Sequence, residues 1–211
     1  MGHKALLALA VLLLVSCTPV QQNSGIPHPS EPAAEKNTQP LSGQISPEAK
    51  GLFDKSAKIK SLYYKYRGPE TGSNFYEFYI KGDKIKYKPY LEIKTLDRQD
   101  SYDAVFIDKA QKTAASYCEA AHCLYKGKKA DLEYSKAYIS TIFDWVDVSR
   151  AEKIGEEVID DRSTWKIDSD RGILWIDTFY GIPLKAESNG NTYRFQQISA
   201  NSLQDSDVVP S

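Results

Sequence analysis

The feature that most constrains the fold of this chain is a period-two alternation of apolar and polar residues. In the segment 59–67, Leu62, Tyr64 and Tyr66 fall on one face of an extended chain. Successive side chains of a strand point to opposite faces of a sheet, so this pattern predicts a strand. The same pattern, bounded by Gly, Pro, Asn and Asp, predicts further strands at 74–81, 84–90, 92–95, 102–107, 112–117, 151–159, 163–169, 172–177, 184–188 and 191–198.

Short turns between these segments indicate an antiparallel sheet. Gly82-Asp83 and Asn189-Gly190 are hairpin signals between alternating runs. Parallel strands need long crossovers, usually helical, and a single helical pattern interrupts the strands. We therefore expect an antiparallel meander of about nine to eleven strands, which at that size tends to curl.

Two helices are expected beside the sheet. Ser46-Pro47-Glu48 combines a capping hydroxyl, a proline for the first turn and an acid at the positive end, and predicts an amphipathic helix over 47–58. Between 128 and 145, apolar residues recur at helical spacing, which predicts an inserted helix. The expected fold class is mostly β (α+β): a curved antiparallel sheet with an N-terminal helix and an inserted helix.

The N-terminal segment has the form of a lipoprotein signal. Lys4 precedes an apolar block over 5–15, which is shorter than the ~20 residues that span a bilayer and has the length of a signal-peptide core. Leu14-Val15-Ser16-Cys17 follows and resembles the prokaryotic lipobox, whose cysteine is lipidated and becomes the first residue of the mature protein. We expect a signal peptide over 1–16 and a lipid on Cys17, with the domain outside the cytoplasm. The alternative is an ordinary secreted or membrane-anchored precursor in which this cysteine occurs by chance.

A tether and one folded domain are expected after Cys17. The segment 17–45 is rich in Pro, Gln, Asn, Ser and Glu, and buries too little apolar surface to offset the entropy of ordering it. We therefore expect a lipidated, disordered tether over 17–45 and a folded domain over 46–211.

The charge and cysteine content exclude some partners and leave the state of two cysteines open. The net charge of -1 and the lack of a basic stripe speak against nucleic acid. Cys118 and Cys123 are close in sequence, and in an exported chain they indicate a disulfide. Free thiols and a metal site that includes His122 are alternatives, although zinc prefers four ligands.

No catalytic constellation is visible in the sequence. His122 is the only histidine of the predicted domain and lies between the two expected disulfide partners, and no nucleophile elbow, phosphate-binding glycine loop or zinc-protease motif occurs. The aspartates fall at predicted turns, where Asp is favoured for its geometry. We expect no enzyme activity, no metal and no cofactor.

The segment Leu174-Trp175-Ile176-Asp177, followed by Gly181-Ile182-Pro183, resembles the LolA-like superfamily of periplasmic lipoprotein carriers and related envelope lipoproteins. The amphipathic helix that leads into a long strand over 47–67 is similar as well. Shorter matching segments are Gly155-Glu156-Glu157-Val158, Trp165-Lys166-Ile167, Tyr193-Arg194-Phe195 and Val208-Val209-Pro210. The resemblance implies an unclosed half-barrel over 46–211, with helices that cover an apolar cavity for acyl chains.

The aromatic content, 14 Tyr, 7 Phe and 3 Trp, has two interpretations. Tyrosine packs well on half-exposed strands, or the sheet has an apolar concave face that binds lipid. The candidate ligand-binding residues are Leu62, Tyr64, Tyr66, Tyr76, Phe78, Ile80, Tyr87, Trp165 and Trp175. The expected function is binding of a lipid or of lipoprotein acyl chains by a membrane-anchored lipoprotein, and the alternative is a structural or sensory lipoprotein that binds a protein partner.

Overall fold

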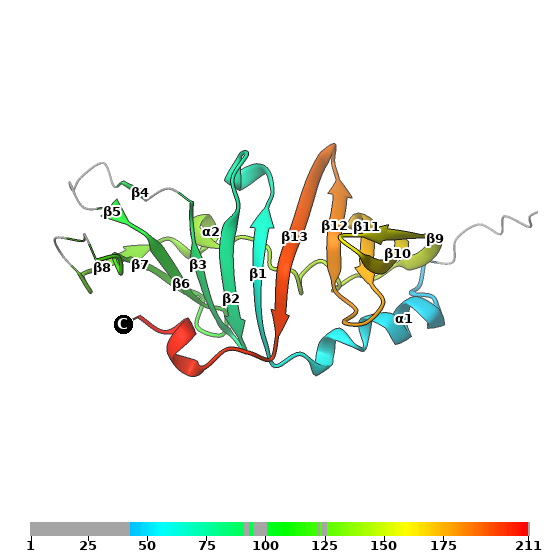
Figure 1. Cartoon of the computed structure of the whole chain (residues 1–211), viewed down its shortest axis with the longest axis horizontal. Coiled ribbons are helices and arrows are strands. Elements are labelled where there is room, and N and C mark those ends of the chain that lie inside the picture. The colour runs from blue at the N-terminus through cyan, green and yellow to red at the C-terminus, as the bar shows by residue number, and fades with distance from the viewer. Residues whose placement is uncertain (1–42, 91–92, 95–100, 122, 124–125, 211) are drawn as a thin grey trace, which may run out of the picture. The chain divides into compact units, whose positions relative to one another are not determined.

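One large antiparallel sheet dominates the structure. The computed structural model describes residues 43–90, 93–94, 101–121, 123 and 126–210. Within them, eleven strands form a single sheet and two short strands form a separate pair (Figure 1). The signal peptide, Cys17, the tether up to residue 42 and His122 lie outside the described residues.

The observed strands follow the predicted ones closely along most of the chain. Their bounds are β1 (Ser61–Arg67), β2 (Tyr76–Lys81), β3 (Lys84–Lys88), β4 (Ile93–Lys94), β5 (Ser101–Tyr102), β6 (Ala104–Asp108), β7 (Thr113–Tyr117), β8 (Lys129–Leu132), β9 (Ala151–Ile159), β10 (Arg162–Ser169), β11 (Gly172–Asp177), β12 (Pro183–Ser188) and β13 (Asn191–Ala200).

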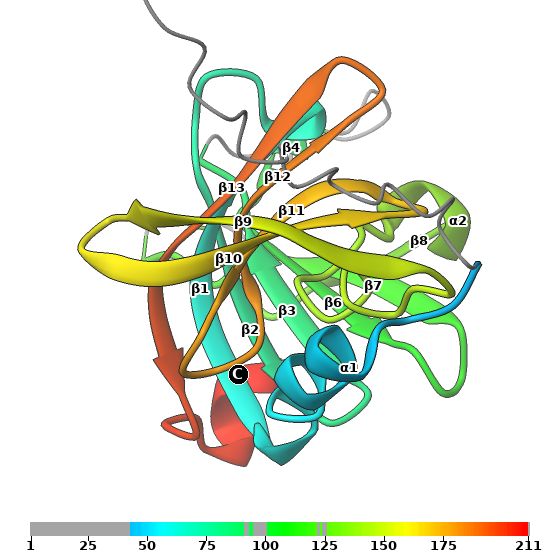
Figure 2. The same cartoon turned by 90° about the vertical axis from the view of Figure 1, so that its right-hand side faces the viewer.

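The sheet consists of two meanders joined at the centre. The strand order is β8-β7-β6-β3-β2-β1-β13-β12-β11-β10-β9, and every neighbouring pair is antiparallel. The first and last strands meet in the middle, where Leu62 pairs with Ala200 and Tyr66 with Phe195. Figure 2 shows β9 and β10 running across the direction of β1 and β2, so the sheet is strongly curved. β8 and β9 remain edge strands, which confirms a mostly β, unclosed half-barrel.

The N-terminal helix forms as predicted but is shorter. α1 (Pro47–Phe53) begins at Ser46, whose Oγ accepts a hydrogen bond from Ala49 N at 3.3 Å. It buries Ala49, Leu52 and Phe53 against the sheet, and a single 3₁₀ turn, η1 (Ser56–Lys58), continues it into β1. A second 3₁₀ turn, η2 (Pro69–Thr71), follows β1, and η3 (Asp205–Val208) follows β13.

The inserted helix predicted over 128–145 is wrong for most of its length. Residues Lys129–Leu132 form the edge strand β8, and α2 (Tyr134–Ala137) is a single helical turn. Beyond it, Asp144 Oδ2 accepts hydrogen bonds from Thr141 N at 2.6 Å and from Thr141 Oγ1 at 2.8 Å. Such local side-chain bonds to the backbone compete with helix formation, and here they fold the segment into turns.

The disulfide that was predicted between Cys118 and Cys123 is present, with a Cα–Cα distance of 5.8 Å. It closes a small loop directly after β7. The pairing leaves no thiolate for a metal, although Asp103 brings a carboxylate oxygen within 4.8 Å of both sulfurs.

Candidate functional site: the inner face of the sheet and its cover

The inner face of the sheet carries a continuous row of aromatic side chains. Tyr64 on β1 pairs with Phe78 on β2, and their rings stack with centroids 5.1 Å apart. Phe78 in turn stacks on Tyr87 of β3 at 5.3 Å. The row arises because alternating residues of neighbouring strands share a face, so the apolar period seen in the sequence becomes one surface.

Eight of the nine candidate ligand-binding residues belong to this inner face. Six of them are buried in the main core, and Tyr76 and Trp165 are partly buried against it. The six are Leu62, Tyr64, Tyr66, Phe78, Ile80 and Tyr87. The structure therefore brings these eight residues together.

Trp175 is not brought together with the other candidates. It lies on the outer face of β11, in a small cluster with Ile159 and Leu184. Its strand neighbours Leu174 and Ile176 point inward, as expected for alternating side chains. The Nζ atoms of Lys185 and Lys166 lie 3.9 and 5.0 Å from its ring centroid. The prediction that Trp175 belongs with the inner candidates is therefore not supported by its position in the outer cluster.

The candidate set omitted Phe195 and the residues that cover the inner face. Phe195 on β13 lies between Tyr64 and Tyr66, with ring centroids 5.9 and 5.6 Å away. The alternation in Tyr193-Arg194-Phe195 carried a signal for it. Ile142 and Trp145 belong to the covering segment and are buried in the same core. They lie outside the strands, so the alternation of strand residues could not predict their position.

The segment 138–148, here called the cover, packs against the inner face. It contains no helix or strand. Two inner tyrosines hold it and the turn of α2 before it. The Ile142 N–H donates to Tyr64 Oη at 3.2 Å, and the Tyr87 hydroxyl donates to the Ala137 carbonyl at 3.1 Å. Burial raises the pKa of both tyrosines, well above the usual range for Tyr64, so the hydroxyls stay protonated. The cover is thus fixed by a few specific hydrogen bonds and by three buried side chains, Thr141, Ile142 and Trp145.

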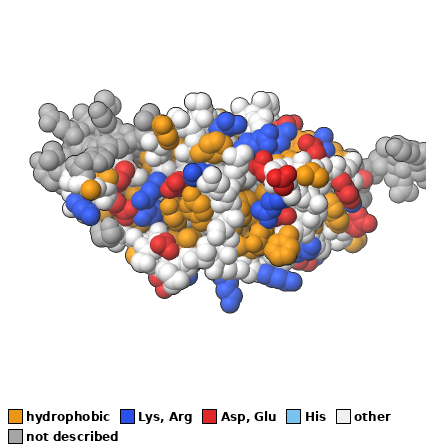
Figure 3. Space-filling model, viewed as in Figure 1, with side chains coloured by type: hydrophobic (Ala, Val, Ile, Leu, Met, Phe, Trp, Pro, Cys, Tyr) orange, Lys and Arg blue, Asp and Glu red, His pale blue; other side chains and the backbone are white. Residues whose placement is uncertain are grey.

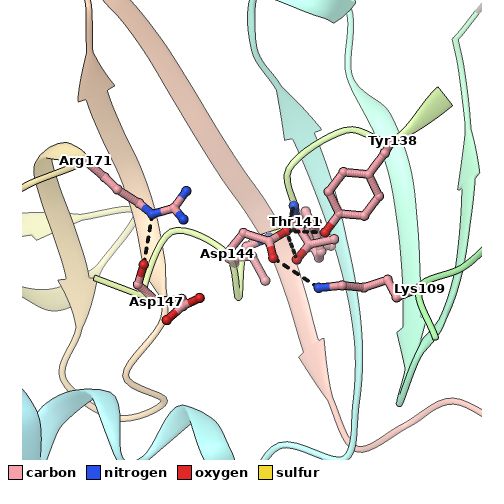
Figure 4. A network of polar contacts seen from close by, with 8 residues as sticks. Lys109, Tyr138, Thr141, Asp144, Asp147 and Arg171 are labelled. Carbon is pink, nitrogen blue, oxygen red and sulfur yellow. Dashed lines mark hydrogen bonds and ion pairs between the residues drawn. The ribbon is translucent and has the colours of Figure 1, made fainter. Parts of the chain in front are cut away.

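A polar latch fastens the cover to the turn after β6 (Figure 4). Asp144 Oδ1 accepts from Lys109 Nζ at 3.1 Å, and its Oδ2 accepts from the Tyr138 hydroxyl at 2.6 Å and from Thr141. Arg171 Nε donates to the Asp147 carbonyl at 2.9 Å beyond the latch. Four groups therefore converge on one partly buried carboxylate.

The latch sets the pKa values of its members. Burial alone would raise the pKa of Asp144, but hydrogen bonds from Tyr138, Thr141 and Lys109 outweigh burial and lower it. Burial alone would lower the pKa of Lys109, and the bonds to Tyr138 and Asp144 raise it to about 12. Burial and the bond to Asp144 raise the pKa of Tyr138 to about 12. At neutral pH the latch is therefore an ion pair bridged by a neutral phenol.

One buried polar group of the cover, the indole N–H of Trp145, lacks a hydrogen-bond partner among the described residues. Its ring packs against Tyr193 with centroids 4.5 Å apart. A buried donor without an acceptor costs about 1–3 kcal/mol, which makes this part of the cover less favourable than its apolar contacts suggest.

A groove of about 550 Å³ lies beside one end of the cover. Its apolar lining comes from η1 and the residues after it, from β2 and from the cover, and Lys60 and Asp147 lie at its margin. The lining residues are Ser56, Ala57, Ile59, Lys60, Ile80, Gly82, Phe143, Val146 and Asp147. This volume is in the range of small-molecule sites, and Ile80 connects the groove with the inner aromatic row.

Comparisons with known proteins give a likeness of fold only. No protein-family model and no curated protein matches the chain. Solved structures that resemble it include an uncharacterised conserved protein from Thermus thermophilus (TM-score 0.47, 11% identity, 76% of this chain and 92% of that chain). Others are the Mycobacterium tuberculosis lipoprotein LppX (0.42, 13%, 76% and 98%) and Pseudomonas aeruginosa MucB in its complex with MucA (0.41, 12%, 78% and 61%). At these values we draw no functional argument from them. None of the described helices is long and apolar enough to cross a membrane.

Proposed function

We propose that this protein is a lipid-anchored envelope protein whose half-barrel binds a hydrophobic ligand, an acyl chain of a lipid or of a lipoprotein. The lipobox-like Cys17 and the LolA-like sequence segments support this assignment. The observation that carries it is the inner aromatic row beneath a cover without regular structure, with an apolar groove at the margin of that cover.

An acyl chain would replace the cover rather than fill an empty barrel. Ile142 and Trp145 together contribute roughly 3–6 kcal/mol by burial, whereas about ten methylenes contribute about 8 kcal/mol. The released Trp145 Nε1 would also gain access to an acceptor. An acyl chain that enters through the groove would have to replace these contacts and also those of Phe143 and Val146, and it would have to offset the hydrogen bonds of the latch.

Native mass spectrometry of the purified protein before and after organic extraction tests the proposal. A bound mass that is lost on extraction, fragments as lipid and returns on incubation with fatty acid is expected. Phe143→Glu places a charge in the groove and should abolish the return, while Val158→Glu on the edge strand should leave it intact. A bare mass that no lipid changes would contradict the proposal.

A protein partner is the second candidate function. The inner face is already covered, and the edge strand β9 exposes Ile154 (52%) and Val158 (68%). An extended peptide can add to such an edge through its backbone, with pockets for alternate side chains. A bare mass together with loss of a co-purified protein in Val158→Glu would favour this function. Neither candidate involves a catalytic step.

A further inference from the structure

We infer that one end of the domain docks on the surface of an anionic membrane. This end, here called the docking end, consists of Lys55, Lys58 and Lys60 around η1 and of Phe179 in the turn between β11 and β12. The inference goes beyond the proposed ligand and uses only the anchoring part of the proposed function.

Phe179 is the most exposed large apolar residue of the described chain, at 74%. The turn that presents it is fixed. Thr178 N–H donates to the Ser163 carbonyl at 3.0 Å, and Lys55 Nζ donates to the Thr178 carbonyl at 2.6 Å. Because two hydrogen bonds fix the residue before it, Phe179 is exposed by an ordered turn. Aromatic side chains in such positions are typical of membrane interfaces.

The three lysines of the docking end are not neutralised. Lys55, Lys58 and Lys60 are exposed, and among the described residues none of them forms an ion pair. The nearest acid in sequence, Asp54, pairs with Lys50 at 3.2 Å. Figure 3 shows Lys or Arg side chains projecting from the lower margin of the molecule next to hydrophobic surface. Lysines without an acidic partner can bind anionic lipid headgroups, and an exposed aromatic ring can enter the apolar layer beneath the headgroups.

The path of the chain allows the docking end to reach the membrane that holds the anchor. α1 runs directly into η1, so the segment that follows the proposed tether also carries the three lysines. Cys17, the proposed lipid anchor, precedes this segment in the sequence, so the anchor would hold the domain at a membrane surface on which this end could dock. The apolar groove opens at the same end, because Ala57 and Lys60 line it. Docking would therefore bring the groove next to the bilayer.

Site-directed spin labelling of the lipidated full-length protein in vesicles tests this inference. A nitroxide at Phe179→Cys reports the docking end, and one at Thr192→Cys, an exposed position at the other end of β12 and β13, is the positional control (Figure 1). In vesicles of equal parts phosphatidylcholine and phosphatidylglycerol, the label at 179 should be accessible to oxygen and shielded from a water-soluble nickel chelate. The label at 192 should remain in water.

Charge variants test the role of the lysines. Lys58→Ser/Lys60→Ser keeps the Lys55 contact with the turn and should lower the ratio of docked to undocked protein about 25-fold, at about fivefold per lysine. Lys65→Ser/Lys88→Ser removes two charges from the outer face and should leave the ratio unchanged. A label at 179 as exposed to the chelate as the label at 192, or immersion that survives Lys58→Ser/Lys60→Ser, would overturn the inference. If the label at 179 is immersed but mass spectrometry finds no bound lipid, the docking inference would stand and only the proposed hydrophobic ligand would be contradicted.

Discussion

Asp144 shows at the scale of one residue how a segment without helix or strand is held in place. It accepts hydrogen bonds from three side chains and one backbone N–H, and it belongs to the segment that covers the inner face. Asp144→Asn removes the charge that these donors share, so we expect the free energy of unfolding to fall by about 2 kcal/mol. Urea denaturation measures this. Asp147→Asn is the matched control, because Asp147 takes part in the described bonds through its backbone carbonyl, and a change above about 0.5 kcal/mol there would argue against a specific latch.

The latch also predicts how stability depends on pH. The folded-state pKa of Asp144 is lowered, so its contribution is complete above the ordinary value of about 3.9 and is lost as the pH falls through the lowered value. The pKa of Lys109 is raised to about 12, so its contribution is complete below the ordinary value of about 10.4 and is lost as the pH rises through about 12. The stability difference between wild type and Asp144→Asn, measured by urea unfolding at several pH values, should be constant near neutrality and shrink in acid. A difference that grows in acid would contradict this sign.

Gly181 is required by the backbone of the turn that presents Phe179. Its φ is +71°, and an added Cβ would lie 2.2 Å from the Leu52 carbonyl oxygen of α1. Gly181→Ala should therefore lower the free energy of unfolding by more than about 2 kcal/mol, from strain at positive φ plus the clash. Gly190→Ala is the control with a similar φ of +77° and nothing within 4 Å, and it should cost about 1 kcal/mol. Thermal unfolding of the two variants separates the strain at positive φ from the clash with Leu52. Equal losses of unfolding free energy in the two variants would show that the structure relieves the clash.

At the scale of elements, the sequence predicted strands well and the cover poorly. The alternation is a property of each strand alone, so β9 and β11 were predicted with their observed bounds. The turns after α2 depend on the bonds between Thr141 and Asp144, while their apolar residues repeat at a spacing that looks helical. In this segment the hydrogen bonds between Thr141 and Asp144 favour turns, although the spacing of the apolar residues favours a helix.

The candidate site was predictable where strands are adjacent and regular. Tyr64, Phe78 and Tyr87 share a face because β1, β2 and β3 follow one another through short connections. The alternation of β11 predicts two faces but does not say which face points inward. In the structure, the face that carries Trp175 points outward. Its pairing with β12 also contains a register shift between Trp175 and Ile176. The cover and the groove depend on contacts between distant segments, which no local pattern encodes.

The disulfide is expected to act locally on the edge of the first meander. It closes a short loop after β7, so the chain-entropy contribution is at or below about 2 kcal/mol. Cys118→Ser/Cys123→Ser should lower the free energy of unfolding by no more than this amount. Amide hydrogen exchange should accelerate in β7 and β8 and stay unchanged in β9 to β13. Loss of the whole fold in the double variant would show that the loop supports far more than its own edge.

At the scale of the whole molecule, the pairing of β1 with β13 holds two meanders together. Phe195 packs between Tyr64 and Tyr66 at this seam, so Phe195→Ala should lower the free energy of unfolding by about 3–5 kcal/mol. Both halves should weaken together. In a Trp145→Phe background, tryptophan fluorescence comes from Trp165 and Trp175 and reports the C-terminal half, and hydrogen exchange in β2 and β3 reports the other half. Midpoints that separate would show that the meanders are independent.

The same seam has a consequence for a chain that crosses a membrane with its N-terminus leading. β1 would emerge early, yet its partner β13 (Asn191–Ala200) is the last strand of the described residues. Until β13 had also crossed, β1 would have one unpaired edge and its aromatic side chains would lack Phe195. Exposed edges and apolar surface of this kind invite aggregation, so a stalled chain would depend on chaperones outside the cytoplasm. For such a chain, the arrival of β13, rather than the synthesis of any one hairpin, would be the event that commits the domain to its fold.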